Sequence, residues 1–148
     1  MCEILKTYSS FTKIFCDQIS SFELMNKKSL EILKKIGIEQ KINKEYYCLI
    51  ELSNFQDINN FQDYIMDKIV SLSLNLDDVI LTKNEQENLK FWNIRELIPL
   101  AEKKEKFVIK HDVSIPLENM DQFINETDQK LKKNFSAEII NFGHIGDN

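Results

Sequence analysis

Residues 107–115 alternate between apolar and polar side chains, which is the pattern of a strand with one buried face and one solvent-facing side. Strands of a doubly wound parallel sheet are buried on both faces, so their sequences are near-continuous apolar runs. The alternation therefore favours a mainly antiparallel sheet over the doubly wound alternative. Strand parity predicts His111 on the apolar, core-facing side with Ile109, and Lys110 on the opposite side with Asp112.

Helical and strand periodicities alternate along the rest of the chain, and about five elements of each kind are expected. Asn26 and Asn84 are predicted helix caps, with Glu87 as the capping-box partner of Asn84. Strands are predicted at 20–25, 46–52, 78–82, 107–115 and 137–142. Helices are predicted at 6–20, at 26–33, from Asn54 or Asp57 to about residue 74, from Asn84 to Pro99 with a kinked continuation to 104 as an alternative, and at 117–133. The pattern predicts one α+β domain over residues 1–148, a ferredoxin-like two-layer sandwich with helices on one face of the sheet.

Composition excludes several classes of protein. The chain has 148 residues and a net charge of -5, whereas a nucleic-acid binder normally shows a basic excess. No apolar run approaches the roughly 18 residues of a membrane span, and the first residues contain no secretory signal. Cys2, Cys16 and Cys48 are odd in number and widely spaced, so we expect reduced thiols, no disulfide and a cytoplasmic location.

Glycine is scarce, and this bears on cofactor binding. The chain has Gly37, Gly143 and Gly146 only, whereas a phosphate-binding loop needs several glycines close together. We therefore predict that the purified chain binds no flavin or other nucleotide cofactor by itself.

Arg95 is the only arginine among nineteen basic residues. On a helix it shares a face with Trp92 and Ile98, so its charge lies on or beside the buried stripe and needs a partner. One interpretation is an ion pair with a local acid, or a side chain that reaches solvent at the edge of the stripe. The other is a bidentate contact with the carboxylate of a substrate.

Lys110 and His144 also allow two interpretations each. Lys110 is either solvated or paired with Asp112, or else it binds a ligand. His144 lies between Gly143 and Gly146 at the end of the last predicted strand, as a turn residue, a metal ligand or a base. A zinc site takes three or four protein ligands, so the other ligands would have to lie outside this chain.

Three strings together resemble one family. They are W-x-x-R-E at 92–96, K-H-D-V-S-x-P at 110–116 and F-G-H-x-G-D at 142–147. Over nearly its whole length the chain resembles the C-terminal, substrate-side domain of FAD-linked oxidases, the group of the glycolate oxidase subunit, D-lactate dehydrogenase and D-2-hydroxyglutarate dehydrogenase.

The resemblance implies a mechanism and a set of roles. A separate FAD-binding domain carries the flavin, and a 2-hydroxy acid lies between the flavin and this domain. Its C2 hydrogen leaves as hydride to the flavin and its hydroxyl proton goes to a base, while a divalent metal ion, commonly zinc, polarises the hydroxyl in some members. Arg95 matches the arginine that binds the substrate carboxylate, Lys110 the lysine that assists it, and His144 the first metal-binding histidine.

The family pattern also implies what this chain lacks. The second histidine, the later metal-binding acid and the base would lie beyond Asn148, so we expect a C-terminally truncated domain without catalytic residues of its own. Asn148 stands where the family has glycine. Pro99 stands where the hydroxyglutarate branch has threonine, and this favours a smaller acid such as lactate or glycolate.

Two expectations follow for the structure and for the function. Arg95, Lys110 and His144 should converge on one open face of the sheet, with their charged ends within roughly 10 to 12 Å, the reach of a small ligand and its contacts. The functional alternative is a stand-alone domain that has lost catalysis and serves as an interaction module.

Overall fold

A three-stranded antiparallel sheet forms the centre of the computed structural model, which describes residues 2–55, 58–72 and 74–146, apart from the side chain of Cys2. Strand β1 (Ile19–Asn26) lies between β2 (Tyr46–Leu52) and β3 (Phe142–His144). The α+β class and the antiparallel pairing are therefore confirmed.

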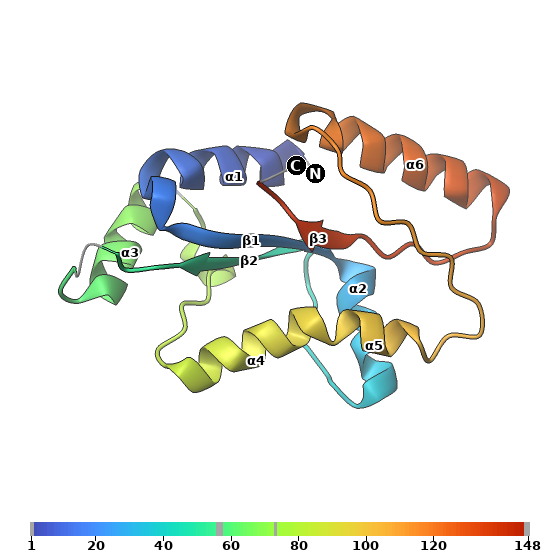
Figure 1. Cartoon of the computed structure of the whole chain (residues 1–148), viewed down its shortest axis with the longest axis horizontal. Coiled ribbons are helices and arrows are strands. Elements are labelled where there is room, and N and C mark those ends of the chain that lie inside the picture. The colour runs from blue at the N-terminus through green and yellow to red at the C-terminus, as the bar shows by residue number, and fades with distance from the viewer. Residues whose placement is uncertain (1, 56–57, 73, 147–148) are drawn as a thin grey trace.

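Helices cover both faces of this sheet (Figure 1). Helices α1 (Cys2–Phe15), α3 (Phe61–Ser71) and α6 (Met120–Asn134) contribute to one core, while α2 (Lys27–Glu31), α4 (Glu85–Glu96) and α5 (Ile98–Glu102) contribute to the other. Short 3₁₀ turns complete the elements at Cys16–Gln18, Ile32–Ile36, Leu76–Asp78 and Leu117–Asn119. None of the helices in the described part of the chain is long and apolar enough to cross a membrane.

The prediction that helices lie on one face of the sheet was wrong, and strand β1 shows the reason. All its residues from Ser21 to Asn26 are buried, because the side chains of both parities meet a helical layer. Phe22 and Leu24 belong to the α1 and α3 core, and Met25 belongs to the α2 and α5 core. A strand buried on both sides needs cover on both sides.

Residues 107–115 do not form a strand, although their alternation predicts one. The segment follows α5 as irregular extended chain, and the side chains of Phe107 and Ile109 are 95% and 86% exposed. No described strand pairs with it, so its apolar positions stay in solvent. His111 is exposed as well, which corrects its predicted place on the core-facing side.

The other differences also have local causes. Residues 78–82 contain the end of a 3₁₀ turn and no strand. Strand β3 begins at Phe142, opposite Met25, whereas the predicted strand covers 137–142. Strand β1 ends one residue beyond Met25, at Asn26, so it does not extend opposite the residues before Asn141. The Asn26 side chain accepts a hydrogen bond from the Ser29 amide at 2.9 Å, so the chain turns there into α2.

Helix capping follows the sequence closely. Asn84 accepts a hydrogen bond from the Glu87 amide at 3.0 Å, and the Glu87 carboxylate accepts one from the Lys83 amide at 2.8 Å. The helix predicted from Asn84, with a kinked continuation beyond Pro99, consists of the two helices α4 and α5, which are divided at Leu97. Pro99 lies in the first turn of α5, where its missing N–H costs nothing.

Candidate functional site

A buried carboxylate joins two of the three predicted site residues. Glu23 of β1, whose side chain is 8% exposed, accepts a hydrogen bond from Arg95 Nε at 2.6 Å through Oε2. Its Oε1 lies 3.0 Å from His144 Nδ1 and 3.5 Å from the hydroxyl of Ser21. Both oxygen atoms of Glu23 are therefore in use, one toward a helix and the other toward a neighbouring strand.

Sheet register and helix position explain how these groups meet. Glu23 and His144 are directly opposite in the β1–β3 pair, so their side chains share a face of the sheet. Arg95 comes from the last turn of α4, the helix that lies along that face. Its guanidinium carbon is 4.9 Å from the ring centre of Phe142, which adds an attractive contact between the cation and the ring.

Arg95 forms an ion pair and also keeps donors that could contact a ligand, so features of both interpretations are present. It forms an ion pair, as the first interpretation expected, but the partner is 72 residues away rather than local. The contact uses Nε, and the two terminal Nη groups form no hydrogen bond with any residue in the described part of the chain. The terminal groups of a guanidinium are the fork that binds a carboxylate, so Arg95 retains donors for a ligand.

Lys110 contacts a second buried carboxylate. It forms a close ion pair with Glu102 of α5, whose side chain is 9% exposed, whereas half of the Lys110 side chain reaches solvent. Lys110 is therefore neither simply solvated nor paired with Asp112. Helix α5 covers the same face of the sheet as Arg95, but within the described ranges no contact links the Lys110 pair to Glu23. The predicted roles of the three residues stay predictions.

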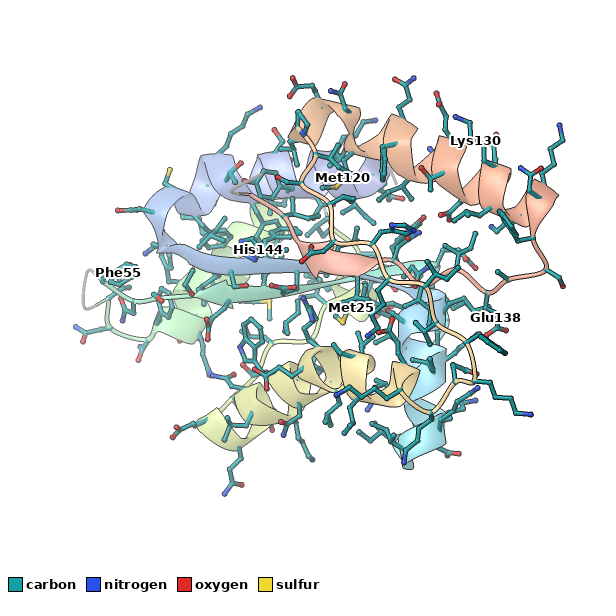
Figure 2. The ribbon with its side chains drawn as sticks, turned by 45° about the vertical axis from the view of Figure 1, so that its right-hand side comes forward. Met25, Phe55, Met120, Lys130, Glu138 and His144 are labelled. Atoms are coloured by element: carbon teal, nitrogen blue, oxygen red, sulfur yellow. The ribbon has the colours of Figure 1, made fainter. Side chains whose placement is uncertain are left out.

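A small cavity of about 60 Å³ lies beside His144. It is bounded by residues from the segment that leads into α6 and by the end of β3, namely Val113, Ser114, Ile115, Leu117, Met120, His144 and Gly146. Figure 2 shows His144 on β3 and Met120 at the start of α6, the two sides between which the cavity opens. Ser114 thus brings a hydroxyl from the K-H-D-V-S-x-P string to the vicinity of the histidine.

Gly146 fixes the turn that follows His144. Its φ of +138° is strained for any other residue, and an added Cβ would lie 3.0 Å from the hydroxyl oxygen of Tyr8. Asp147, the last residue of the F-G-H-x-G-D string, and Asn148 lie outside the described residues.

The described residues do not make up a metal site. Residues 2–146, outside their gaps, contain no group of three His, Cys, Asp or Glu side chains that could hold an ion. His144 directs Nδ1 to Glu23, and the second oxygen of Glu23 faces the cationic Arg95, which disfavours a second cation there. Within the described ranges the predicted metal role of His144 thus lacks supporting ligands.

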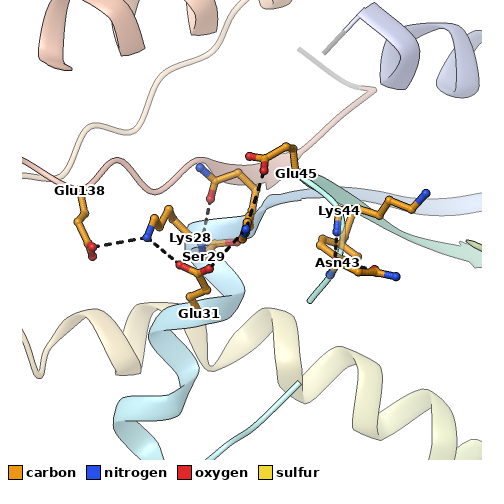
Figure 3. Close-up of polar contacts among 10 residues, drawn as sticks. Lys28, Ser29, Glu31, Asn43, Lys44, Glu45 and Glu138 are labelled. Atoms are coloured by element: carbon orange, nitrogen blue, oxygen red, sulfur yellow. Dashed lines mark hydrogen bonds and ion pairs between the residues drawn. The ribbon is translucent and has the colours of Figure 1, made fainter. Parts of the chain in front are cut away.

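A larger groove, of about 380 Å³, lies on another part of the surface, and Figure 3 shows polar contacts among residues that line it, such as Lys28, Glu31 and Glu138. Its charges are paired with one another: Lys28 contacts Glu31 at 2.8 Å and Glu138 at 3.6 Å. The hydrogen bond to Glu31 and the nearby Glu138 carboxylate raise the pKa of Lys28, and the same hydrogen bond lowers the pKa of Glu31. Exposed ion pairs of this kind contribute little to stability.

Sequence reasoning missed Glu23 and Glu102, the two acids that hold the basic residues. A signal for Glu23 was present, because it is a charged residue between Phe22 and Leu24 in a segment predicted to be a strand. Glu102 follows Ile98 by four residues on a helix, so it shares that buried face. A charge at such positions implies a partner.

The family model for FAD linked oxidases, C-terminal domain, matches residues 5–148. The chain is 26% identical over 134 residues to a mitochondrial D-2-hydroxyglutarate dehydrogenase of Arabidopsis thaliana, covering 87% of this chain and 24% of that protein. It is 22% identical over 153 residues to the Bos taurus protein of the same name, covering 98% and 27%.

A third relative, from Schizosaccharomyces pombe, is provisionally named as a mitochondrial D-lactate dehydrogenase. It is 24% identical over 163 residues, which cover 97% of this chain and 30% of that protein. The chain therefore spans about a quarter of the length of the curated relatives it matches.

Proposed function

Because this chain belongs to the family of FAD-linked oxidase C-terminal domains, we propose that it is the substrate-side domain of an FAD-dependent 2-hydroxy acid dehydrogenase. The observation that carries the proposal is the pairing of Arg95 and His144 on one buried carboxylate, with the Arg95 Nη groups left for a ligand. An anion-binding fork beside an imidazole matches a ligand that has a carboxylate and a hydroxyl on adjacent carbons.

The reaction is an oxidation of that hydroxyl to a carbonyl. The substrate loses the C2 hydrogen with its electron pair and the hydroxyl proton, so a 2-hydroxy acid becomes a 2-oxo acid. FAD, held by another domain, supplies the acceptor for the hydride. In this proposal Arg95 binds the carboxylate, His144 contacts the hydroxyl, and Lys110 adds positive charge near the carboxylate.

Positioning is the contribution of this chain. A carboxylate held by two Nη donors fixes the orientation of C2 relative to the flavin. Holding reactants in place accounts for a large part of the rate enhancement of many enzymes. The base that accepts the hydroxyl proton and the FAD-binding domain are expected outside these residues. We accordingly propose that the isolated chain does not turn over substrate, and that its partner is an FAD-binding domain.

Two substrates are the leading candidates. Similarity to proteins named D-2-hydroxyglutarate dehydrogenase supports D-2-hydroxyglutarate. Pro99, which has no hydrogen-bond donor, lies one turn beyond Arg95 at the start of α5 and supports a smaller acid without a second carboxylate, such as D-lactate or glycolate. The location in the cytoplasm is a separate proposal that depends only on the three scattered cysteines.

Anaerobic flavin reduction tests the proposal in a flavoprotein that unites this domain with an FAD-binding domain. We expect D-lactate or D-2-hydroxyglutarate to bleach the absorbance of the oxidised flavin. Arg95→Lys keeps the charge but loses the fork, so kcat/KM should fall roughly tenfold to a hundredfold. The matched control is Lys90→Arg, an exchange on the exposed side of the same helix.

Two results would contradict the proposal. One is a flavin that stays oxidised with every 2-hydroxy acid, which would favour the alternative of a non-catalytic interaction module. The other is Arg95→Lys kinetics equal to those of the Lys90→Arg control.

A further inference from the structure

Glu23 is the residue through which the two proposed ligand-binding side chains are connected. It is buried, its oxygens each bind one of them, and it was not among the residues that motif spacing singled out. A buried carboxylate costs several kcal/mol unless it is paired and hydrogen-bonded, so its place on β1 calls for an explanation beyond packing.

We propose that Glu23 is a positioning residue that holds the Arg95 fork in place and sets the tautomer of His144. An ionised carboxylate accepts hydrogen bonds and donates none. His144 Nδ1 must therefore carry the proton in the 3.0 Å contact with Oε1, and in the neutral imidazole the lone pair then lies on Nε2. That nitrogen is then the hydrogen-bond acceptor of the ring.

The same carboxylate restricts Arg95. Its Oε2 binds Nε at 2.6 Å while the ring of Phe142 lies 4.9 Å from the guanidinium carbon, so the plane and the direction of the fork are fixed together. Glu23 thus sets the distance between an anion-binding fork and a hydrogen-bond acceptor. The catalytic consequence of this arrangement rests on the proposed function. The tautomer of His144 and the fixed orientation of Arg95 do not depend on that function.

The chain carries its own reporters for a nuclear magnetic resonance test. Arg95 is the only arginine, and the only other histidine, His111, is exposed and serves as an internal reference. With uniform ¹⁵N labelling at alkaline pH, His144 should show a protonated Nδ1, whereas His111 should show the Nε2–H form that exposed imidazoles favour. The Arg95 Nε–H signal should exchange slowly with water.

Glu23→Gln is the decisive variant and Glu51→Gln is its matched control. Glu51 lies on β2, is exposed and accepts a hydrogen bond from Trp92 Nε1 at 3.3 Å, so its replacement makes the same charge change away from Arg95 and His144. Glu23→Gln should abolish the Nδ1–H preference of His144 and speed Arg95 Nε–H exchange at least tenfold, and Glu51→Gln should do neither. Backbone amide spectra would show whether each variant keeps the fold.

Failure of this inference can be separated from failure of the proposed function. In the flavoprotein, Glu23→Gln should lower kcat/KM for the 2-hydroxy acid roughly tenfold to a hundredfold, as loss of an orienting partner does elsewhere. An Nε2–H tautomer of His144 in the unaltered chain, or unchanged signals in Glu23→Gln, overturns the positioning role even if the flavin is reduced normally.

If Glu23→Gln does not fold, the tautomer of His144 in the unaltered chain decides whether Glu23 has the positioning role. If the predicted signals are found but no 2-hydroxy acid reduces the flavin, the positioning role of Glu23 is supported and only the proposed function is overturned.

Discussion

The two faces of strand β1 are built from different chemistry. On one face Phe22 and Leu24 pack into a core with α1 and α3, and Phe22 meets the ring of Tyr8 edge to face at 5.2 Å. On the other face Glu23 lies beside Met25 and binds Arg95 and His144. Apolar burial stabilises a fold directly, whereas a buried ion pair roughly offsets its own desolvation. The second face therefore combines an apolar core around Met25 with a buried ion pair, whereas the first face is an apolar core alone.

The Cys48 thiol shows that a charge is unfavourable on the face that contains Phe22 and Leu24. Cys48 of β2 packs against the core that contains Phe22, and burial raises the pKa of its thiol to about 12. Cys16, which is exposed, and Cys48 both carry free thiols, while the side chain of Cys2 lies outside the described residues. On the opposite face a full carboxylate is accommodated because two partners bind it.

The largest expected loss of stability comes from the apolar face. Phe22→Ala would leave a cavity under Tyr8 and Phe11, so the free energy of unfolding should fall by about 3 to 5 kcal/mol. Urea unfolding followed by circular dichroism measures this. Phe55→Ala, at a side chain that is 70% exposed, is the control and should change little. Equal effects of the two substitutions would show that this face is not the stabilising one.

Breaking the ion pair should cost less, and removing it entirely should cost little. Glu23→Leu leaves the Arg95 charge one-fifth exposed without its partner, and should lower the free energy of unfolding by about 2 to 3 kcal/mol. The double variant Glu23→Leu with Arg95→Met should recover most of that loss. If the double variant is as unstable as the sum of its single changes, the pair stabilises the fold and the contrast between the faces fails.

The buried thiol gives a pH-dependent effect of smaller size. The unfolded thiol ionises above its ordinary pKa of 9.0, whereas burial keeps the folded thiol protonated to about pH 12. The Cys48 contribution to stability is therefore complete below pH 9 and declines above it, by about 1.4 kcal/mol for each pH unit. Unfolding of the unaltered chain and of Cys48→Ala, compared at about pH 8 and about pH 10, should show this difference. Parallel pH profiles would contradict it.

The smallest effect is expected at Lys110. Half of its side chain is exposed, so Lys110→Ala should reduce the free energy of unfolding by about 1 kcal/mol or less, even though Glu102 is buried. Lys103→Ala, an exposed neighbour of the same charge, provides the comparison. A loss as large as that of Glu23→Leu would mean that both acids of this face are structural.

Local sequence patterns predicted the helix caps well, and strand formation and long-range pairing poorly. Asn26 and Asn84 begin helices as expected, because the hydrogen bonds of a helix cap involve neighbours in sequence. Residues 107–115 have the periodicity of a strand, but a strand also needs a partner, and periodicity does not show whether one is present.

The candidate site was also predicted only in part, because its residues were indicated by the sequence but their contacts were not. The family resemblance pointed to Arg95, Lys110 and His144, and the structure brings the first and the last together on Glu23. Glu23 and His144 are 121 residues apart, and only the β1–β3 register makes them neighbours. Strand parity places Glu23 on the same face as Met25, but parity does not show that a helix covers that face.

A titration of the ¹⁵N-labelled chain tests the central claim most directly, namely that the Glu23-held Arg95 fork binds the carboxylate of a 2-hydroxy acid. Because Arg95 is the only arginine, its Nη signals report on that one side chain. D-lactate or D-2-hydroxyglutarate should shift these signals and slow their exchange, and D-lactamide, which has the hydroxyl but no carboxylate, should not. Nη signals that stay unchanged with both acids, or that respond equally to the amide, would contradict the account.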